Sequence, residues 1–311
     1  MSMGRPNLAV QLILLAIYTF SLRVAMASDD LSAVASRCFG DAHKASTFAT
    51  ELAGVPALVR MPAKVTRPPI VLWHGFGSPD SEATLMSALP LDDVPAIKIY
   101  LGLPLFGRRA PVGGKAELVR RQQQDVGLLV FKPIVVGAVD ELPAVVRELE
   151  RRGCMKAGDK IGLFGFSAGG AAALMSLAEH VVPVSSAVVL NPSAGLSASV
   201  AAFEHATGQH YVWSPESRAL AARSDVVERA TDIANGTPPP ALLILQGSGD
   251  EVVGPDELRR LGDALRVRYA QDKATERFSD SVIQGLPHQW IDQPGQIEVR
   301  RQAAAWFNRY P

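Results

Sequence analysis

A serine lies between two glycines where a strand is expected to turn into a helix. Residues 165–169 read Gly-Phe-Ser-Ala-Gly, with Ser167 at the centre. The apolar run IGLF comes directly before them, and the small residues GAAA follow. A sharp turn of this kind exposes the serine hydroxyl at a helix N-terminus, where the helix dipole favours developing negative charge. The pattern predicts that Ser167 is a nucleophile; the alternative is a glycine-rich turn with an incidental serine.

A serine nucleophile needs a general base, and His288 is the candidate among the six histidines of the chain. It lies beyond the last expected strand, in a loop marked by Gly285 and Pro287. Loops carry catalytic side chains on a rigid sheet. We therefore expect His288 to take the proton of Ser167, with a surface-loop histidine as the alternative interpretation.

The base in turn needs an acid that orients it, and Asp250 is the candidate. It lies in a glycine-rich turn after the strand expected at 241–246, and Glu251 beside it is the second candidate. The order Ser167, Asp250, His288 along the chain is one in which serine hydrolases carry their triad. An aspartate in such a turn can also be a simple turn former.

Backbone N–H groups are expected to bind the oxyanion that forms when a serine attacks a carbonyl. Residues 74–77 read His-Gly-Phe-Gly and follow the apolar run 69–73. We expect the N–H groups of Phe76 and Ala168 to form this oxyanion hole, since the glycines allow the backbone to approach a substrate closely. His74 is then a structural residue and not the base.

These residues must be positioned by alternating strands and helices. Short apolar runs bounded by Gly, Pro or Asp predict strands at 69–73, 96–101, 160–165, 186–190 and 241–246, with a weaker one at 281–284. Helical patterns lie at 139–152, 171–179, 256–269 and 297–307. This alternation predicts an α/β fold, a mostly parallel sheet with helices on both faces. The long interval 192–240 lacks strand character, and we expect it to be a small helical cap or lid insertion.

The four segments WHGFGS, GFSAGG, GSGDEVV and GLPHQW together resemble the α/β-hydrolase superfamily. The stretch GDKIGLFGFSAGG at 158–170 is similar to the dienelactone hydrolase and prolyl oligopeptidase branch. The resemblance covers about residue 54 to the C-terminus, and it implies an eight-strand sheet with the nucleophile after the fifth strand. Dienelactone hydrolases carry Cys where this chain has Ser167. Prolyl oligopeptidases carry a large propeller domain, for which too few residues precede the sheet here.

The first 27 residues have the form of a secretory signal peptide. Arg5 is followed by the apolar run 8–20, and the segment ends in Ala25-Met26-Ala27. The run is shorter than the roughly 20 residues that a membrane-spanning helix needs. We expect cleavage after Ala27, no stable membrane anchor after it, a secreted or periplasmic protein, and a hydrolase domain over 28–311. An uncleaved anchor and a buried N-terminal helix are the alternatives.

Composition narrows the possible partners of the chain. Its 311 residues contain 31 Lys and Arg and 31 Asp and Glu, whereas a nucleic-acid-binding protein would normally show a basic excess. No zinc-protease, Walker or dinucleotide-binding motif occurs, so we expect no metal and no cofactor. Secretion would permit a disulfide between the two cysteines, Cys38 and Cys154, although free buried cysteines are an equal alternative. The oligomeric state is not readable from the sequence.

We interpret the sequence as that of a secreted serine hydrolase, most simply a carboxylic ester hydrolase that acts through an acyl-enzyme on a small ester or acyl substrate. A peptidase, amidase or thioesterase would use the same residues, because the triad does not select the leaving group. A secreted binding protein without turnover is the alternative of another class. Trp290 and Trp213 are candidates for the substrate pocket, although each could equally be a core residue.

Overall fold

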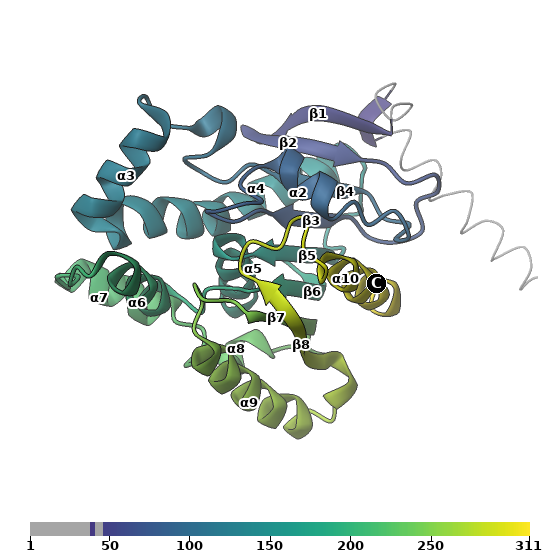
Figure 1. Cartoon of the computed structure of the whole chain (residues 1–311). Helices are drawn as coiled ribbons and strands as arrows, with labels where there is room; N and C mark the ends of the chain where they lie inside the picture. The colour runs from purple at the N-terminus through teal and green to yellow at the C-terminus, as the bar shows by residue number, and fades with distance from the viewer. Residues whose placement is uncertain (1–37, 41–45) are drawn as a thin grey trace, which may run out of the picture.

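The computed structural model describes residues 38–40 and 46–311 of the chain. Its centre is one eight-stranded sheet with the strand order β1-β2-β4-β3-β5-β6-β7-β8, and helices cover both faces (Figure 1). The β1–β2 and β2–β4 pairings are antiparallel, and every other pairing is parallel. This is the α/β-hydrolase fold, so the predicted fold class is confirmed.

Strands and helices alternate along most of the chain. In chain order the elements are β1 (Thr47–Leu52), β2 (Val55–Arg60), β3 (Ile70–Trp73), α2 (Glu82–Ala88), β4 (Lys98–Leu101), η2 (Gly107–Arg109), α3 (Gly114–Asp125), η3 (Gly127–Val136), α4 (Gly137–Arg151), β5 (Ile161–Phe166), α5 (Ala168–Glu179), β6 (Val184–Leu190), α6 (Leu196–Thr207), α7 (Pro215–Ser224), α8 (Ala230–Ile233), β7 (Ala241–Gly249), α9 (Pro255–Gln271), η4 (Thr275–Arg277), β8 (Phe278–Pro287) and α10 (Gln296–Arg309). The predicted signal peptide, residues 1–27, lies outside the described residues. Within the described ranges, no helix is both long enough and apolar enough to cross a membrane.

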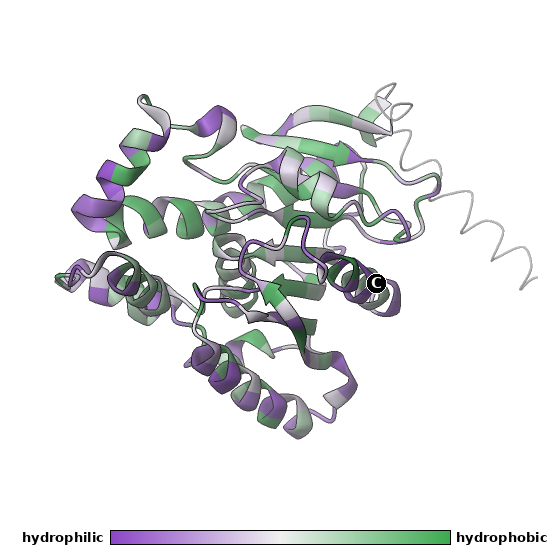
Figure 2. Ribbon diagram, in the orientation of Figure 1, coloured by the Kyte–Doolittle hydropathy of each residue, from purple (hydrophilic) through white to green (hydrophobic). Residues whose placement is uncertain are grey.

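Alternate residues of the central strands enter two apolar cores, one on each face of the sheet. In β3, Val71 and Trp73 belong to the core that includes residues of α4, α5 and α9. Ile70 and Leu72 belong to the opposite core, with residues of α2 and α10. Figure 2 shows hydrophobic colouring along the central strands and hydrophilic colouring on much of α9. Strands buried on both faces read as continuous apolar runs, which is why these strands were predictable from the sequence.

The two strands that the apolar pattern did not predict lie at one edge of the sheet. β1 and β2 are present, as the resemblance to a known eight-strand sheet implied, but the residues of β1 are mostly half-exposed or exposed. β8 is the other edge strand; it alternates between buried and exposed residues, and it extends well beyond the weak signal at 281–284. β1 and β8 have a neighbouring strand on one side only, and their sequences lack a continuous apolar run, whereas β2 lies between β1 and β4 and is mostly buried.

The interval 192–240 contains α6, α7 and α8. α8 contacts α5 and α9 and so belongs to a helical layer of the fold, whereas α6 and α7 contact η3. In Figure 1, α6 and α7 lie at the same side of the molecule as α3. The helices on this side therefore come from two insertions, α6 with α7 and α3 with η3, and the second one was not anticipated from the sequence.

η3 is a π-helix, with a wider turn than an α-helix. The Phe131 N–H donates to the Val126 carbonyl oxygen, five residues back, at 2.9 Å. Pro133 lies inside this helix; proline lacks an N–H, and its ring clashes with the preceding turn of a regular α-helix. The wide turn relieves that conflict, and such turns are frequent at functional sites. The apolar run of η3, GLLVFKPIVV, has no helical periodicity, because both sides of it are largely covered.

Cys38 and Cys154 form a disulfide, which the sequence had left open. The bridge joins the segment before β1 to the chain after α4, across a sequence separation of 116 residues. Both cysteines are buried in the core that lies under α4. The disulfide therefore fixes the start of the described chain to the sheet.

We predict that the double variant Cys38→Ser, Cys154→Ser loses about 2–4 kcal/mol in its free energy of unfolding, because its unfolded chain is no longer cross-linked. Urea denaturation measures the loss. A reductant should lower the stability of the wild-type protein to that of the variant and leave the variant unchanged. Equal stability of the oxidised wild type and the variant would contradict the prediction.

Candidate active site

Ser167 occupies a sharp turn between β5 and α5. Its backbone has φ 53° and ψ −115°, a conformation that side chains other than glycine rarely adopt. Gly165 and Gly169 flank the turn, and a Cβ on either would overlap backbone atoms of the adjoining segment. The glycines on both sides of the serine therefore have a direct steric reason. Ser167 lies at the N-terminus of α5, where the helix dipole is positive.

The structure brings the three predicted triad residues together. His288, in the loop after β8, has its Nε2 3.0 Å from the Ser167 Oγ. Its Nδ1 lies 2.8 Å from the Asp250 Oδ2. A carboxylate can only accept, so the proton lies on Nδ1, and Nε2 is left to accept the hydroxyl proton of Ser167.

Asp250 is held in place by the turn that carries it. Its Oδ1 accepts the N–H groups of Val252 and Val253 at 2.8 and 2.9 Å, while Oδ2 faces His288. The Asp250 side chain is fully buried and that of His288 is 9% exposed. Glu251, the second candidate for the acid, is exposed, so Asp250 is the carboxylate that contacts the histidine.

Asn191 is a buried polar residue that connects the acid and base loops, and the sequence reading missed it. It follows β6 with φ 44°. Its Oδ1 accepts the Gly247 N–H at 2.7 Å, and its Nδ2 donates to the carbonyl oxygens of Pro287 at 3.3 Å and His288 at 3.5 Å. The available signal was its position directly after a parallel strand, at the sheet edge that also carries Ser167.

His74 is a buried structural residue, and its environment keeps it neutral. Its Nδ1 donates to the Gly75 carbonyl oxygen at 2.8 Å, and its Nε2 accepts the Leu103 N–H at 3.2 Å. Burial lowers the pKa of His74 from 6.5 to about 4. The imidazole thus ties the loop after β3 to the loop after β4.

Phe76 and Ala168, the two predicted oxyanion donors, both line a cavity beside Ser167. Ala168 is the first residue of α5, so its N–H has no partner within the helix. Gly75 allows the loop to approach closely, because a Cβ there would meet the Phe166 ring at 2.7 Å and the Ser167 Cβ at 3.1 Å. Gly77 has ordinary space around it, so its small size is not required by packing.

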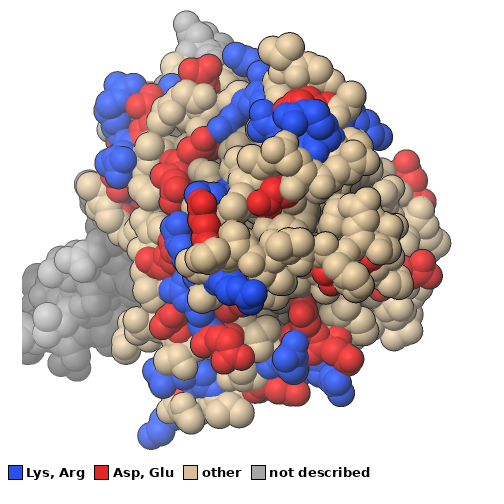
Figure 3. Space-filling model, turned by 90° about the vertical axis from the view of Figure 1, so that its left-hand side faces the viewer, with Lys and Arg blue, Asp and Glu red and all other residues tan. Residues whose placement is uncertain are grey.

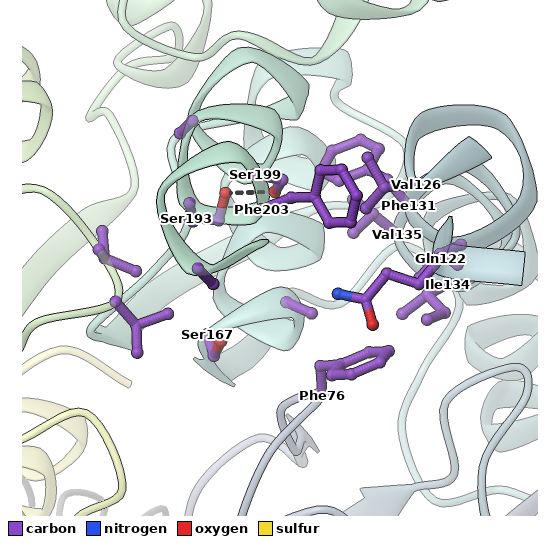
Figure 4. Close-up of a pocket in the computed structure, with 17 residues that line it drawn as sticks. Phe76, Gln122, Val126, Phe131, Ile134, Val135, Ser167, Ser193, Ser199 and Phe203 are labelled. Carbon is purple, nitrogen blue, oxygen red and sulfur yellow. Dashed lines mark hydrogen bonds between the residues drawn. The ribbon is translucent and has the colours of Figure 1, made fainter. Parts of the chain in front are cut away.

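The cavity beside Ser167 has a volume of about 230 Å³ (Figure 4). Most of its wall is apolar and comes from the two insertions, α3 with η3 and α6. Figure 4 shows Phe76, Phe131 and Phe203 around it and the carboxamide of Gln122 directed into it. On this side of the molecule an uncharged area adjoins charged side chains of both signs (Figure 3).

The two tryptophans expected at the substrate pocket do not line this cavity. Trp290 is fully buried in the core under α10 and packs edge-on against Phe166, with 6.1 Å between ring centroids. Trp213 packs edge-on against Tyr211 and supports the insertion from outside. Their size favoured core packing, while the wall of the cavity is made mainly by aliphatic and smaller residues. Among the described residues, no cluster of three or more His, Cys, Asp or Glu side chains could hold a metal ion.

Comparison with known proteins agrees with this architecture. The sequence model of the prolyl oligopeptidase family matches residues 136–311, which is more than half of the chain. No curated protein is similar enough in sequence to match.

Solved structures share the fold at low sequence identity. TT1662 from Thermus thermophilus superposes with a TM-score of 0.62 and 22% identity, covering 85% of this chain and 96% of that one. A hyperthermophilic esterase from the archaeon Pyrobaculum calidifontis gives 0.58 and 17%, covering 99% of both chains. A puromycin-hydrolyzing peptidase from Mycobacterium tuberculosis gives 0.60 and 20%, covering 85% of this chain and 40% of that one.

We predict that Asn191→Ala lowers kcat by about tenfold to a hundredfold and changes KM little, because small displacements of reacting groups are costly while the cavity is untouched. Steady-state kinetics on the folded variant measure both constants. Asn308→Ala is the matched control, since it also removes an amide-to-carbonyl hydrogen bond, to Asp93 at 3.0 Å, but outside the site. Equal effects of the two substitutions on kcat would refute a positioning role for Asn191.

A second prediction follows from the buried neutral His74. The unfolded chain binds a proton at this histidine below about pH 6.5, whereas the folded protein does so only below about pH 4. The free energy of unfolding therefore falls as pH drops through this window, by about 3 kcal/mol in all. Urea denaturation at neutral pH and near pH 4 should show a smaller acid loss in His74→Gln than in the wild type. The same loss in both proteins would exclude His74 as its source.

Proposed function

We propose that this chain, a serine hydrolase that belongs to the prolyl oligopeptidase family, hydrolyses carboxylic esters through Ser167, His288 and Asp250. One observation carries the proposal. A single imidazole lies 3.0 Å from the Ser167 hydroxyl and 2.8 Å from a buried carboxylate that two backbone N–H groups hold. This arrangement supplies a nucleophile, a base and an orienting acid without any further group.

The first half of the reaction forms an acyl-enzyme. The Ser167 oxygen attacks the ester carbonyl carbon as its proton passes to the His288 Nε2, and the carbonyl oxygen becomes an oxyanion. The N–H groups of Phe76 and Ala168 donate to this oxyanion. Asp250 stabilises the imidazolium, which then gives its proton to the departing alcohol as the carbon–oxygen bond breaks.

The second half releases the acid. His288 takes a proton from water, and the resulting hydroxide attacks the acyl carbon. The second tetrahedral intermediate collapses, Ser167 regains its proton from His288, and the carboxylic acid leaves.

The choice of an ester over a peptide substrate rests on the cavity. Among the described residues, its wall contains no charged side chain, and therefore no carboxylate that could hold the ammonium group of a peptide N-terminus. Structural neighbours include an esterase from Pyrobaculum calidifontis and one from Pyrococcus furiosus, as well as peptidases. An amidase or thioesterase activity of the same site is the alternative, and a scaffold that binds without turnover is the alternative of another class.

We further propose that the protein acts outside the cytoplasm. The N-terminal segment 1–27 has the pattern of a secretory signal peptide. The Cys38–Cys154 disulfide supports this proposal, because structural disulfides persist in oxidising compartments. The mass of the N-terminus of the exported protein tests cleavage after Ala27, and an intact N-terminus would point to an uncleaved anchor.

The test of the catalytic proposal combines labelling with turnover. We expect a fluorophosphonate probe to modify Ser167 alone, as mass spectrometry would show, and the purified protein to hydrolyse p-nitrophenyl esters. Ser167→Ala should lose labelling and at least about 99.9% of turnover, because no other group can form the acyl-enzyme. Ser176→Ala is a matched control, since this serine is also buried and lies on α5, but it does not line the cavity and lies outside the proposed triad.

Three other outcomes would change the proposal. Turnover of p-nitroanilides without turnover of esters would replace the ester hydrolase by an amidase. Labelling without turnover of either would leave the triad but not the substrate class. A protein that the probe does not modify would be a binding protein on a hydrolase scaffold.

A further inference from the structure

The cavity beside Ser167 runs along α6. Hydrogen bonds at the two ends of this helix fix where it begins and ends. Just before the first turn, the Ser193 N–H donates to the Ser167 carbonyl oxygen at 3.3 Å, and the Ser193 hydroxyl lies 2.8 Å from that of Ser199 in the helix. At the last turn, the Glu204 Oε1 accepts the Tyr211 N–H at 2.7 Å, and the Tyr211 hydroxyl donates to Asp125 at 2.8 Å. α6 therefore runs from the nucleophile to the junction of α3 and η3.

Small residues of α6 leave the space that forms the cavity. Ala198, Ala202 and Ala206 recur at every fourth position and all line it. Residues at this spacing lie on one face of a helix, and the first and last of them are about 12 Å apart along its axis. Across from this face stand the aliphatic and aromatic side chains of η3. The cavity is thus a channel with apolar walls that begins at Ser167.

The far part of the channel carries one uncommitted polar side chain. Gln122 lies in α3, one helical turn before Asp125, and so close to the end where Tyr211 anchors α6. Its carboxamide points into the cavity (Figure 4), and no described residue forms a hydrogen bond with it. Besides Ser167 and Gln122, the polar side chains of the wall are Ser193 and Ser199, and their hydroxyl groups form a hydrogen bond with each other.

The channel takes the acyl side of the substrate and not the alcohol. The leaving alcohol must lie beside His288, which protonates it, and His288 does not line the cavity. Phe76 and Ala168, which would bind the oxyanion of the acyl carbon, do line it. The volume also sets a size, because an apolar cavity of about 150 Å³ takes benzene. At about 230 Å³, the cavity beside Ser167 has room for a group about one and a half times the size of benzene.

We infer that the channel binds the acyl chain of the substrate, that this chain is neutral, apolar and of about octanoyl length, and that it passes Ala202 on its way to the far end. Gln122 offers a hydrogen bond to a neutral polar group at the far end of the chain. This inference rests on the proposed ester hydrolysis and names its substrate class. A carboxylate at the end of the chain is excluded, since the described wall has no cation to pair with it.

The experiment compares kcat/KM for the p-nitrophenyl esters of acetate, octanoate and palmitate and for the mono-ester of suberate, in which a carboxylate replaces the terminal methyl group of octanoate. We expect octanoate to exceed acetate and palmitate by about tenfold or more, since added methylene groups are buried until the channel is full. Suberate should fall below octanoate by about a hundredfold or more.

Substitution of the channel wall tests the position of the chain. Ala202→Phe should lower the octanoate-to-acetate ratio by about tenfold or more, because the ring fills the channel. Ala201→Phe is the matched control on the same helix, since Ala201 is exposed and does not line the cavity. Should Ala202→Phe not fold, Ala206→Phe narrows the exposed far end. Gln122→Leu should reduce turnover of the 8-hydroxyoctanoate ester relative to octanoate, whereas the wild type accepts both.

The outcomes separate this inference from the proposed function. Acetate turned over as well as octanoate, suberate turned over as well as octanoate, or an unchanged ratio in Ala202→Phe would overturn the acyl channel and leave an ester hydrolase. Failure of all esters would overturn the ester hydrolase, and the octanoyl and acetyl p-nitroanilides would then carry the same comparison. A preference for the octanoyl anilide would support the channel in an amidase, and equal rates would refute it.

Discussion

The backbone turn at Ser167 is the constraint on which the rest of the structure depends. A serine at φ 53° is strained, and such strain persists only where the surroundings fix it. Here the Ser167 N–H donates to the Leu190 carbonyl oxygen at 3.1 Å, and the Ser167 carbonyl oxygen accepts the Ser193 N–H at 3.3 Å. Hydrogen bonds to the end of β6 thus hold both sides of the turn. Close packing of Gly169 against the backbone at Trp73 and His74 adds a third segment.

The same sheet edge explains how distant residues become partners. Ser167 and His288 are 121 positions apart in sequence, and Asp250 and His288 are 38 apart. β5, β6, β7 and β8 are neighbours and parallel, so the residues that follow them meet at one edge, where open α/β sheets bind their ligands. Asn191 follows β6 in the middle of this row. Its side-chain amide accepts a hydrogen bond from Gly247 in β7 and donates one to Pro287 at the end of β8, which a side chain without both a donor and an acceptor could not do.

The sequence predicted those parts of the molecule in which a short local pattern of residues has one physical explanation. Buried central strands are continuously apolar, and the turn at Ser167 admits only glycine at 165 and 169. The predictions were weaker where the cause is not local. The edge strand β1 has no continuous apolar run, and η3 is apolar without helical periodicity because its neighbours cover it. The sequence identified Trp290 as a large side chain but not the direction in which it points, because that direction depends on its packing against Phe166.

The site is built partly from the sheet edge, which holds the residues placed for the reaction, and partly from the two insertions, which form the wall of the cavity. The residues placed for the reaction are fixed by the sheet edge and by hydrogen bonds to backbone groups. The wall of the cavity comes mainly from α6 and from α3 with η3, which take no part in the sheet. Side chains such as Ala202 and Gln122 have no bonds to the reacting groups, so changing them reshapes the cavity and leaves the geometry at Ser167 intact. Under the proposed function, the fold can therefore keep one reaction while the insertions select the acyl group.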